Sequence, residues 1–177
     1  MTAVVVFLVQ SALSILVLFL MVVWFVAPYL ARQPIRKVML LLLSPHVAHH
    51  VGLAVLVSGV VAEHFPSDFA LIIAIGEPTM LALFLLSMGA LRHGSPVAVP
   101  LLWVFTVAGF AYNVAAAVDG AIHGSDLVEK LHAHWYVSVF YVPLLAVSHV
   151  LVLLNLLRRG DELRAALAPR TARSARA

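Results

Sequence analysis

The fold is decided by residues 3–29, which read AVVVFLVQSALSILVLFLMVVWFVAPY and hold only Gln10, Ser11 and Ser14 as polar interior residues. A helix needs about 20 apolar residues to cross a hydrocarbon core of about 30 Å. This run is long enough, and it lacks the charged start and the short apolar core of a signal peptide. We therefore expect it to be a membrane-spanning helix.

Four further segments have the same character, and together they predict five transmembrane helices. They cover residues 38–64, 69–91, 97–121 and 130–157. Short polar breaks that contain Pro and Gly separate them, as helix termination requires. We expect an all-α membrane protein with a five-helix transmembrane domain at residues 1–159 and a basic cytoplasmic tail at residues 160–177.

The composition of the whole chain agrees with this interpretation. Its 177 residues are 63% hydrophobic and 11% charged, whereas a typical globular domain has about 25% charged residues. So little charge cannot cover the surface of a soluble fold. The chain contains no cysteine, which excludes disulfides and iron–sulfur clusters held by this chain alone.

The basic residues predict how the helices are oriented. On a five-span path, ten of the eleven Lys and Arg residues fall on one side of the membrane, and only Lys130 falls on the other. Because basic loops stay in the cytoplasm, we expect the N-terminus outside and the C-terminus in the cytoplasm, in a bacterial inner membrane. This basic rim beside the membrane lipid explains the net charge of +3 without a nucleic-acid partner.

Nine histidines are the unusual feature of the sequence, and several lie inside the predicted spans. Ionisable side chains at membrane depth are costly, so they indicate a functional site. His50 and His64 share one face of the second span, about 21 Å apart along its axis. His134 and His149 lie about 22 Å apart on the fifth span, offset by roughly 60°. Since these spans are antiparallel, we expect His149 to face His50 and His64 to face His134.

Two facing imidazoles at each of two depths are the arrangement that two bis-histidine haem groups require. We therefore predict that these four histidines bind the iron of two haem b groups, which would carry electrons across the membrane. Gly52 and Gly59 flank the histidine face of the second span, where small residues would let a haem ring approach the backbone.

With these residues in place, the chain resembles the cytochrome b (gamma) subunit of respiratory nitrate reductases. The matching pieces are His50-Val51-Gly52, Lys130-Leu131-His132 and the Pro143-to-His149 spacing. The resemblance implies an electron-transfer subunit of a respiratory oxidoreductase. Such a subunit exchanges electrons with menaquinone or ubiquinone and with cytoplasmic iron–sulfur and catalytic subunits. The His50–His64 spacing is about one helical turn longer than the pattern of that family.

The choice of individual ligands stays open at two places. The resemblance favours His132 over His134, whereas helix phase favours His134. His46 or His49 could replace His50, because His46 lies on the same α-helical face one turn inward.

A second interpretation rests on the sequence His46-Val47-Ala48-His49-His50. Its H-x-x-H-H spacing is similar to one histidine box of membrane di-iron desaturases and hydroxylases, and implies a non-haem iron oxygenase. Those enzymes need several boxes. Here the remaining close pair, His132 and His134, is expected at the opposite side of the membrane.

Three polar residues within the spans are further candidates. Glu77, beside Pro78, is the one carboxylate deep in a span. We expect it either to be hydrogen-bonded to backbone loosened by Pro78 or to line a proton or quinone path. Tyr112 and Asn113 are expected to make hydrogen bonds between helices.

Overall fold

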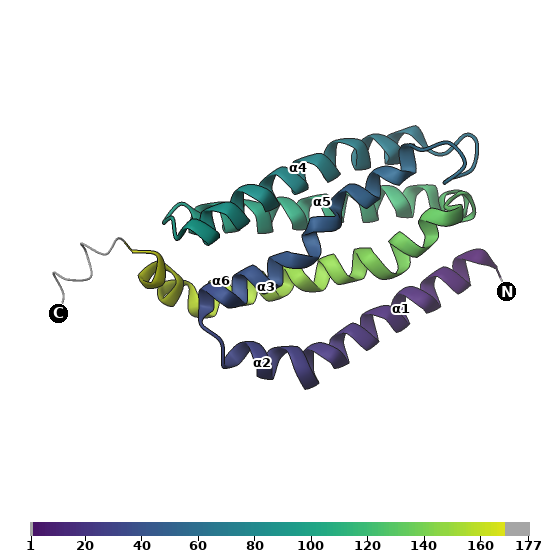
Figure 1. Ribbon diagram of the computed structural model, residues 1–177. Coiled ribbons are helices and arrows are strands. Elements are labelled where there is room, and N and C mark those ends of the chain that lie inside the picture. Colours follow the sequence, from purple (N-terminus) through teal and green to yellow (C-terminus); the bar gives the residue numbers. More distant parts are fainter. Residues whose placement is uncertain (1, 169–177) are drawn as a thin grey trace, which may run out of the picture.

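The computed structural model describes residues 2–168, and the named elements of this part of the chain are all helical (Figure 1). Five long apolar helical segments can cross a membrane: Ala3–Ala31, Ile35–Leu56, Ser67–His93, Ala98–Lys130 and His132–Leu167. The predicted all-α fold with five spans is confirmed, and the chain has the architecture of a multi-pass membrane protein.

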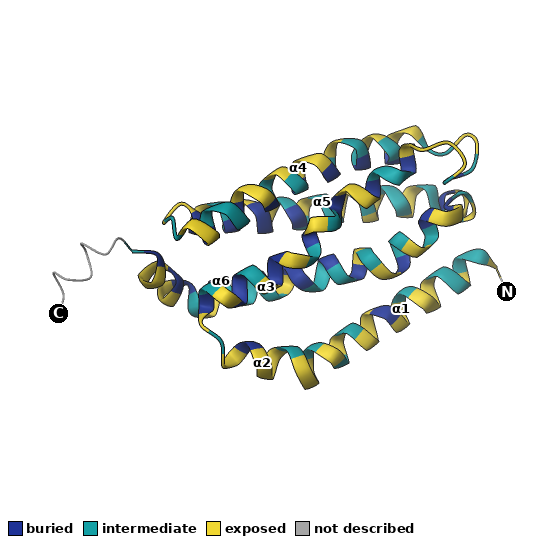
Figure 2. Ribbon diagram, viewed as in Figure 1, coloured by how far each residue is buried: buried dark blue, intermediate teal, exposed yellow. Residues whose placement is uncertain are grey.

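The first span is the least buried of the five (Figure 2). It consists of α1 (Ala3–Met21), a π-helical turn η1 (Val22–Val26) and α2 (Ala27–Ala31). Most of its large apolar side chains are exposed, which suits a helix that faces lipid. Its link to the last span includes a 2.7 Å hydrogen bond from Nε1 of Trp135 to Oε1 of Gln10.

The second span changes its helix type halfway. It begins as α3 (Ile35–Leu43) and continues as a 3₁₀ helix, η2 (Ser44–Leu56). Pro45 has no backbone N–H and therefore cannot continue the α-helical hydrogen-bond pattern at this point. The predicted outer end at residue 64 was wrong, because the helix ends at Leu56 and Gly59 adopts a positive φ of 87°.

The third span is one helix, and the fourth is a long helix with a kink near its end. They are α4 (Ser67–His93) and α5 (Ala98–Lys130), and each is longer than predicted. The difference is two residues at either end of α4, which is within the usual uncertainty of helix boundaries. The backbone of α5 departs from helical geometry at Gly124, with φ 52° and ψ −124°, and helical structure resumes beyond that residue.

The fifth span starts with two short helices, η3 (His132–His134) and η4 (Val137–Tyr141), and continues as α6 (Val142–Leu167). The helix passes the predicted end at residue 157, with a kink at Arg159. The first residues of the predicted tail are therefore helical. Residues 169–177 of that tail lie outside the described residues.

Basic residues connect several elements at one end of the bundle. Nε of Arg36 donates to the carbonyl of Leu91 at 2.7 Å, and Nη2 of Arg159 donates to the carbonyl of Gln33 at 3.1 Å. Since both arginines belong to the predicted cytoplasmic rim, this packing is compatible with the predicted charge distribution. The orientation in the membrane stays a prediction.

The interior between η2, α4, α5 and α6 is unusually polar. Alongside buried Leu, Phe and Met residues, it holds a set of buried polar side chains: His46, His49, Glu77, Ser87, Thr106, His134, Ser148 and His149. Because α4 packs against both α5 and η2, and α6 packs against α3 and α5, these groups gather within one bundle interior.

Candidate metal centre

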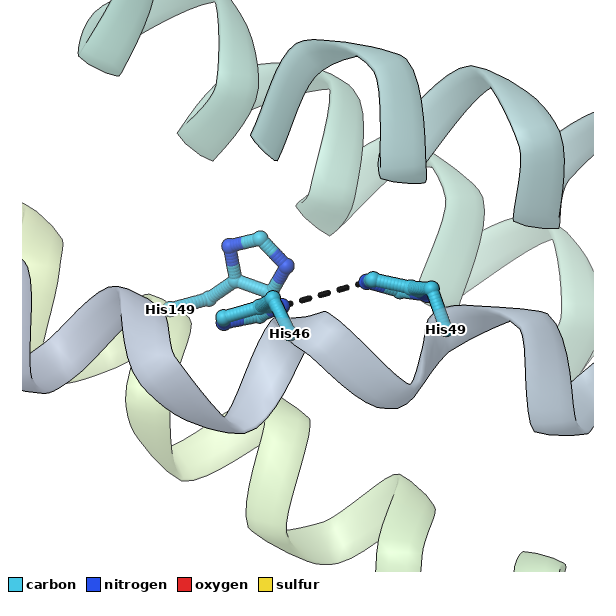
Figure 3. Close-up of side chains that lie close together, drawn as sticks. All are labelled: His46, His49 and His149. Atoms are coloured by element: carbon cyan, nitrogen blue, oxygen red, sulfur yellow. Dashed lines mark hydrogen bonds between the residues drawn. The ribbon is translucent and has the colours of Figure 1, made fainter. Parts of the chain in front are cut away.

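Three histidines form one buried cluster, shown in Figure 3. His46 and His49 come from η2, and His149 comes from α6. Each is at most 1% exposed. One nitrogen of each ring lies within 4.8 Å of a nitrogen of the other two. The ring centroids of His46 and His149 are 4.5 Å apart, and those of His46 and His49 are 5.2 Å apart.

The 3₁₀ winding of η2, which has a kink at Ala48 (φ −94°, ψ 15°), indicates which histidines point inward. In a 3₁₀ helix, side chains three residues apart eclipse one another, so His46 and His49 share a face. His50 falls on a different face, where it is exposed and its Nδ1 lies 3.3 Å from the carbonyl oxygen of Val47. The predicted pairing of His50 with His149 assumed an α-helix. The structure instead brings His149 together with His46 and His49.

The outer nitrogens of His46 and His49 are held by polar partners. Nδ1 of His49 lies 2.8 Å from Oε2 of Glu77, and Nε2 of His46 lies 3.1 Å from Oγ of Ser148. Ser148 donates its own proton to the carbonyl of Leu42, so its oxygen accepts from His46. An imidazole that binds a metal commonly has its second nitrogen hydrogen-bonded in this way, because the bond fixes the tautomer and the ring orientation.

The inner nitrogens of these two rings lie within hydrogen-bond distance of each other (Figure 3), and the tautomers decide which ring donates. Nδ1 of His46 and Nε2 of His49 are 3.1 Å apart. Two nitrogens bound to one tetrahedral metal ion at about 2.0–2.1 Å would be roughly 3.4 Å apart, which is close to this distance.

His149 completes the cluster with two free nitrogens. Both ring nitrogens are buried, and neither has a hydrogen-bond partner in the described part of the chain. Phe105 packs against the ring, with centroids 4.7 Å apart. Burying unpaired polar atoms destabilises a protein, so this side chain is suited to a ligand that would satisfy it.

Glu77 connects the cluster to the fourth span. Its Oε1 accepts a 2.8 Å hydrogen bond from the hydroxyl of Tyr112, while its Oε2 faces His49. The predicted role of Tyr112 as an interhelical partner is confirmed. The same prediction for Asn113 was wrong, because its Nδ2 donates to the carbonyl of Gly109 one turn earlier on its own helix. The bonds of Glu77 run to side chains and not to the backbone near Pro78.

Glycines make room for the polar side chains of the centre. A Cβ atom added to Gly52 would lie 2.4 Å from Glu77, and one added to Gly109 would lie 2.1 Å from the ring of His149. Gly76 accommodates Tyr112 in the same way. Gly52 was expected beside a cofactor, whereas the roles of Gly76 and Gly109 follow only from the packing of neighbouring helices.

Replacing Gly109 by alanine is expected to displace the His149 ring and destabilise the protein by about 1–3 kcal/mol, as overpacking of a core does. The loss should appear as a lower unfolding midpoint in a denaturant titration of the detergent-solubilised chain. Gly89 is a matched control in α4, since an added Cβ there meets nothing within 4 Å. An equal effect of G89A and G109A would contradict the packing role of Gly109.

The remaining predicted ligands lie apart from this cluster. His64 is exposed in the segment between η2 and α4, and its carbonyl accepts a 3.0 Å bond from Nζ of Lys130. His132 is exposed, whereas His134 is buried with 4% of its surface accessible. The structure therefore places His64 and His134, the predicted outer pair, in different surroundings.

A cavity of about 460 Å³ adjoins the cluster. Its wall includes Gly52 and Glu77, which also belong to the surroundings of His49, and the buried His134. Most other lining side chains are apolar and come from α1, α4, α5 and the last span. Glu77 thus lies between the histidine cluster and the cavity, one hydrogen bond from each of His49 and Tyr112.

Comparison with known proteins gives a match over most of the chain. A family model described as "Domain of unknown function (DUF8737)" matches residues 6–157, which include all three clustered histidines. No curated protein matches the chain, and no solved structure matches it.

Proposed function

The chain belongs to the DUF8737 family, and we propose that it is a membrane metalloprotein that holds one redox-active metal ion between His46, His49 and His149. The observation that carries the proposal is the arrangement of the nitrogens. One ring nitrogen of His46 and one of His49 are hydrogen-bonded to polar partners, Ser148 and Glu77. The other nitrogens of these two rings lie 3.1 Å apart, and one nitrogen of each of the three rings lies within 4.8 Å of the other two.

The ligand set indicates the kind of ion. Imidazole nitrogens suit iron, copper, zinc and nickel, whereas magnesium and calcium prefer oxygen. Three protein ligands leave a coordination position open, as in catalytic metal sites, whereas structural zinc sites have four. We favour iron or copper, because Glu77 connects the histidine cluster to an apolar cavity, and electron exchange with a lipid-soluble molecule there would need a redox-active ion. This function is closest to the non-haem iron interpretation of the sequence.

A di-haem cytochrome is the second candidate. It is favoured by His134 and His149, two buried histidines on one span whose Nδ1 atoms have no hydrogen-bond partner among the described residues. In that case the protein would pass electrons between the quinone pool and a cytoplasmic iron–sulfur partner, with its N-terminus outside the bacterial inner membrane. A single ion ranks first, because a macrocycle between His46 and His149 would have to separate two rings whose centroids are only 4.5 Å apart.

Metal analysis and optical spectra of the full chain, purified from metal- and haem-replete cells, would test both candidates. We expect about one iron or copper ion per chain and no b-type α-band in the reduced-minus-oxidised spectrum. A sharp α-band with two haem groups per chain would support the second candidate and contradict the first. Absence of both metal and haem would overturn both proposals.

A further inference from the structure

The cavity beside the metal centre is elongated along the helices. One face of α5 lines it through residues four positions apart, which are Tyr112, Ala116, Gly120 and Gly124. At 1.5 Å per residue this face is about 18 Å long. On α4 the lining residues Phe69, Ile73 and Glu77 have the same spacing. The cavity is therefore a narrow space parallel to the bundle, with a volume of about 460 Å³.

The wall of this cavity is mainly apolar. No Lys or Arg among residues 2–168 lines it, and its one carboxylate, Glu77, is hydrogen-bonded to two side chains of the protein. The hydroxyls of Tyr112 and Tyr141 and the amide of Asn113 all donate to groups within the protein. Most other lining residues are Ala, Gly, Val, Leu, Ile or Phe. Such a wall suits an uncharged hydrocarbon.

The two ends of the cavity differ in exposure. Glu77 and Leu145 at one end are buried, and the hydrogen bond from Glu77 to His49 separates this end from the histidine cluster. Ala117 and Ala121 of α5 line the cavity and are exposed, and only the first two turns of α1 border it. Since α1 is the least buried span, a hydrocarbon chain can enter here from the bilayer.

We propose that the cavity binds one acyl chain of a bilayer phospholipid, with the chain end near Glu77 and the head group outside. The length of about 18 Å is close to the depth of one leaflet, which is half of a hydrocarbon core of about 30 Å. The direction also agrees, because lipid chains and transmembrane helices both run across the bilayer. A bound chain does not depend on the metal ion, and the lipid-soluble redox partner of the proposed function would enter by displacing it.

Photolabelling of the full-length protein in nanodiscs tests this proposal. The probe is a phosphatidylcholine with a diazirine at the end of one acyl chain, and peptide mass spectrometry locates the labels. We expect labels on Ile73 and Leu145, which line the cavity but are only 6% and 4% exposed. Phe84 is equally buried outside the cavity wall and should stay unlabelled. Labels only on exposed residues such as Leu71, or equal labelling of Phe84 and Ile73, would overturn the proposal.

Two leucine variants of α5 provide a matched comparison. A117L fills part of the cavity, whereas A115L adds the same volume at an exposed position outside the cavity wall. Because both alanines are exposed, neither leucine is forced into a packed core. Labelling of Ile73 should be lost in A117L and kept in A115L. Equal labelling of Ile73 in the two variants would contradict the lipid site.

The occupant can also be identified directly, by organic extraction of detergent-washed protein. We expect phospholipid from the wild type and A115L, and less from A117L. An aromatic compound in place of phospholipid would contradict the proposal. Labelling of Ile73 should persist in metal-free protein. A chain that is labelled there but binds no metal would refute the proposed function alone, and a chain that binds metal without this label would refute the lipid site alone.

Discussion

The H149A variant is expected to lose stoichiometric metal, with its affinity lowered more than 100-fold. His149 supplies one of only three nitrogens to the proposed ion, and both of its ring nitrogens are otherwise unpartnered in the described part of the chain. Even partners that merely orient a metal-binding histidine change affinity by about 10–100-fold, so loss of a ligand should exceed that range. Competition with a chromophoric chelator would measure the affinity.

Three further variants, H46A, H49A and H50A, test whether the loss of metal affinity is confined to the clustered histidines. H46A and H49A should behave like H149A, whereas H50A should retain the wild-type affinity because His50 faces away from the cluster and is exposed. His50 and His49 are adjacent in sequence, so the comparison is closely matched. Loss of metal in H50A but not in H49A would show that the span binds the ion as an α-helix.

The E77L variant is expected to combine a loss of stability with a loss of metal affinity. Leucine would leave Nδ1 of His49 and the hydroxyl of Tyr112 unpaired in the interior. At about 1–3 kcal/mol for each buried group left unpaired, the free energy of unfolding should fall by about 2–6 kcal/mol. The affinity for the ion should fall by about 10–100-fold, since His49 would lose the partner that orients it.

A denaturant titration and the chelator competition would measure the two effects in the same preparation. E77Q provides a variant that retains hydrogen-bonding capacity if E77L fails to fold, and it should still weaken metal binding. Y112F is the matched control, because it removes the cavity-side bond of Glu77 and leaves the bond to His49. Metal affinity that is unchanged in E77Q and reduced in Y112F would contradict the orienting role of Glu77.

The number and type of the spans could be predicted from the sequence because lipid imposes a simple rule on length and hydropathy. The rule is weaker at the ends, where polar residues are tolerated. Residues 57–64 look apolar enough to continue the second span, yet they form an irregular segment. The Ser58-Gly59 pair was the available sequence signal for this end.

The histidine site could be predicted only in part. The importance of His149 and of the histidine-rich stretch in span two follows from the cost of ionisable groups in a membrane. The inward face of that stretch depends on whether 3.6 or 3.0 residues complete a turn, and Pro45 was the residue that could have indicated the change. Ser148 gave no signal, because its contact with His46 joins residues 102 positions apart.

The 3₁₀ winding of η2 also changes how far the second span reaches. Its 3₁₀ parts rise about 2.0 Å per residue, whereas an α-helix rises about 1.5 Å, so they cover more length per residue on either side of a kink at Ala48. The helix ends at Leu56, before the predicted end at residue 64. The chain that follows lies across the start of the fifth span. There the amide of Ala133 donates to the carbonyl of Val60 at 3.1 Å, and the amide of Ala62 donates to the carbonyl of Lys130 at 3.0 Å. Because η2 ends early, residues 57–64 are available to cover the start of the fifth span.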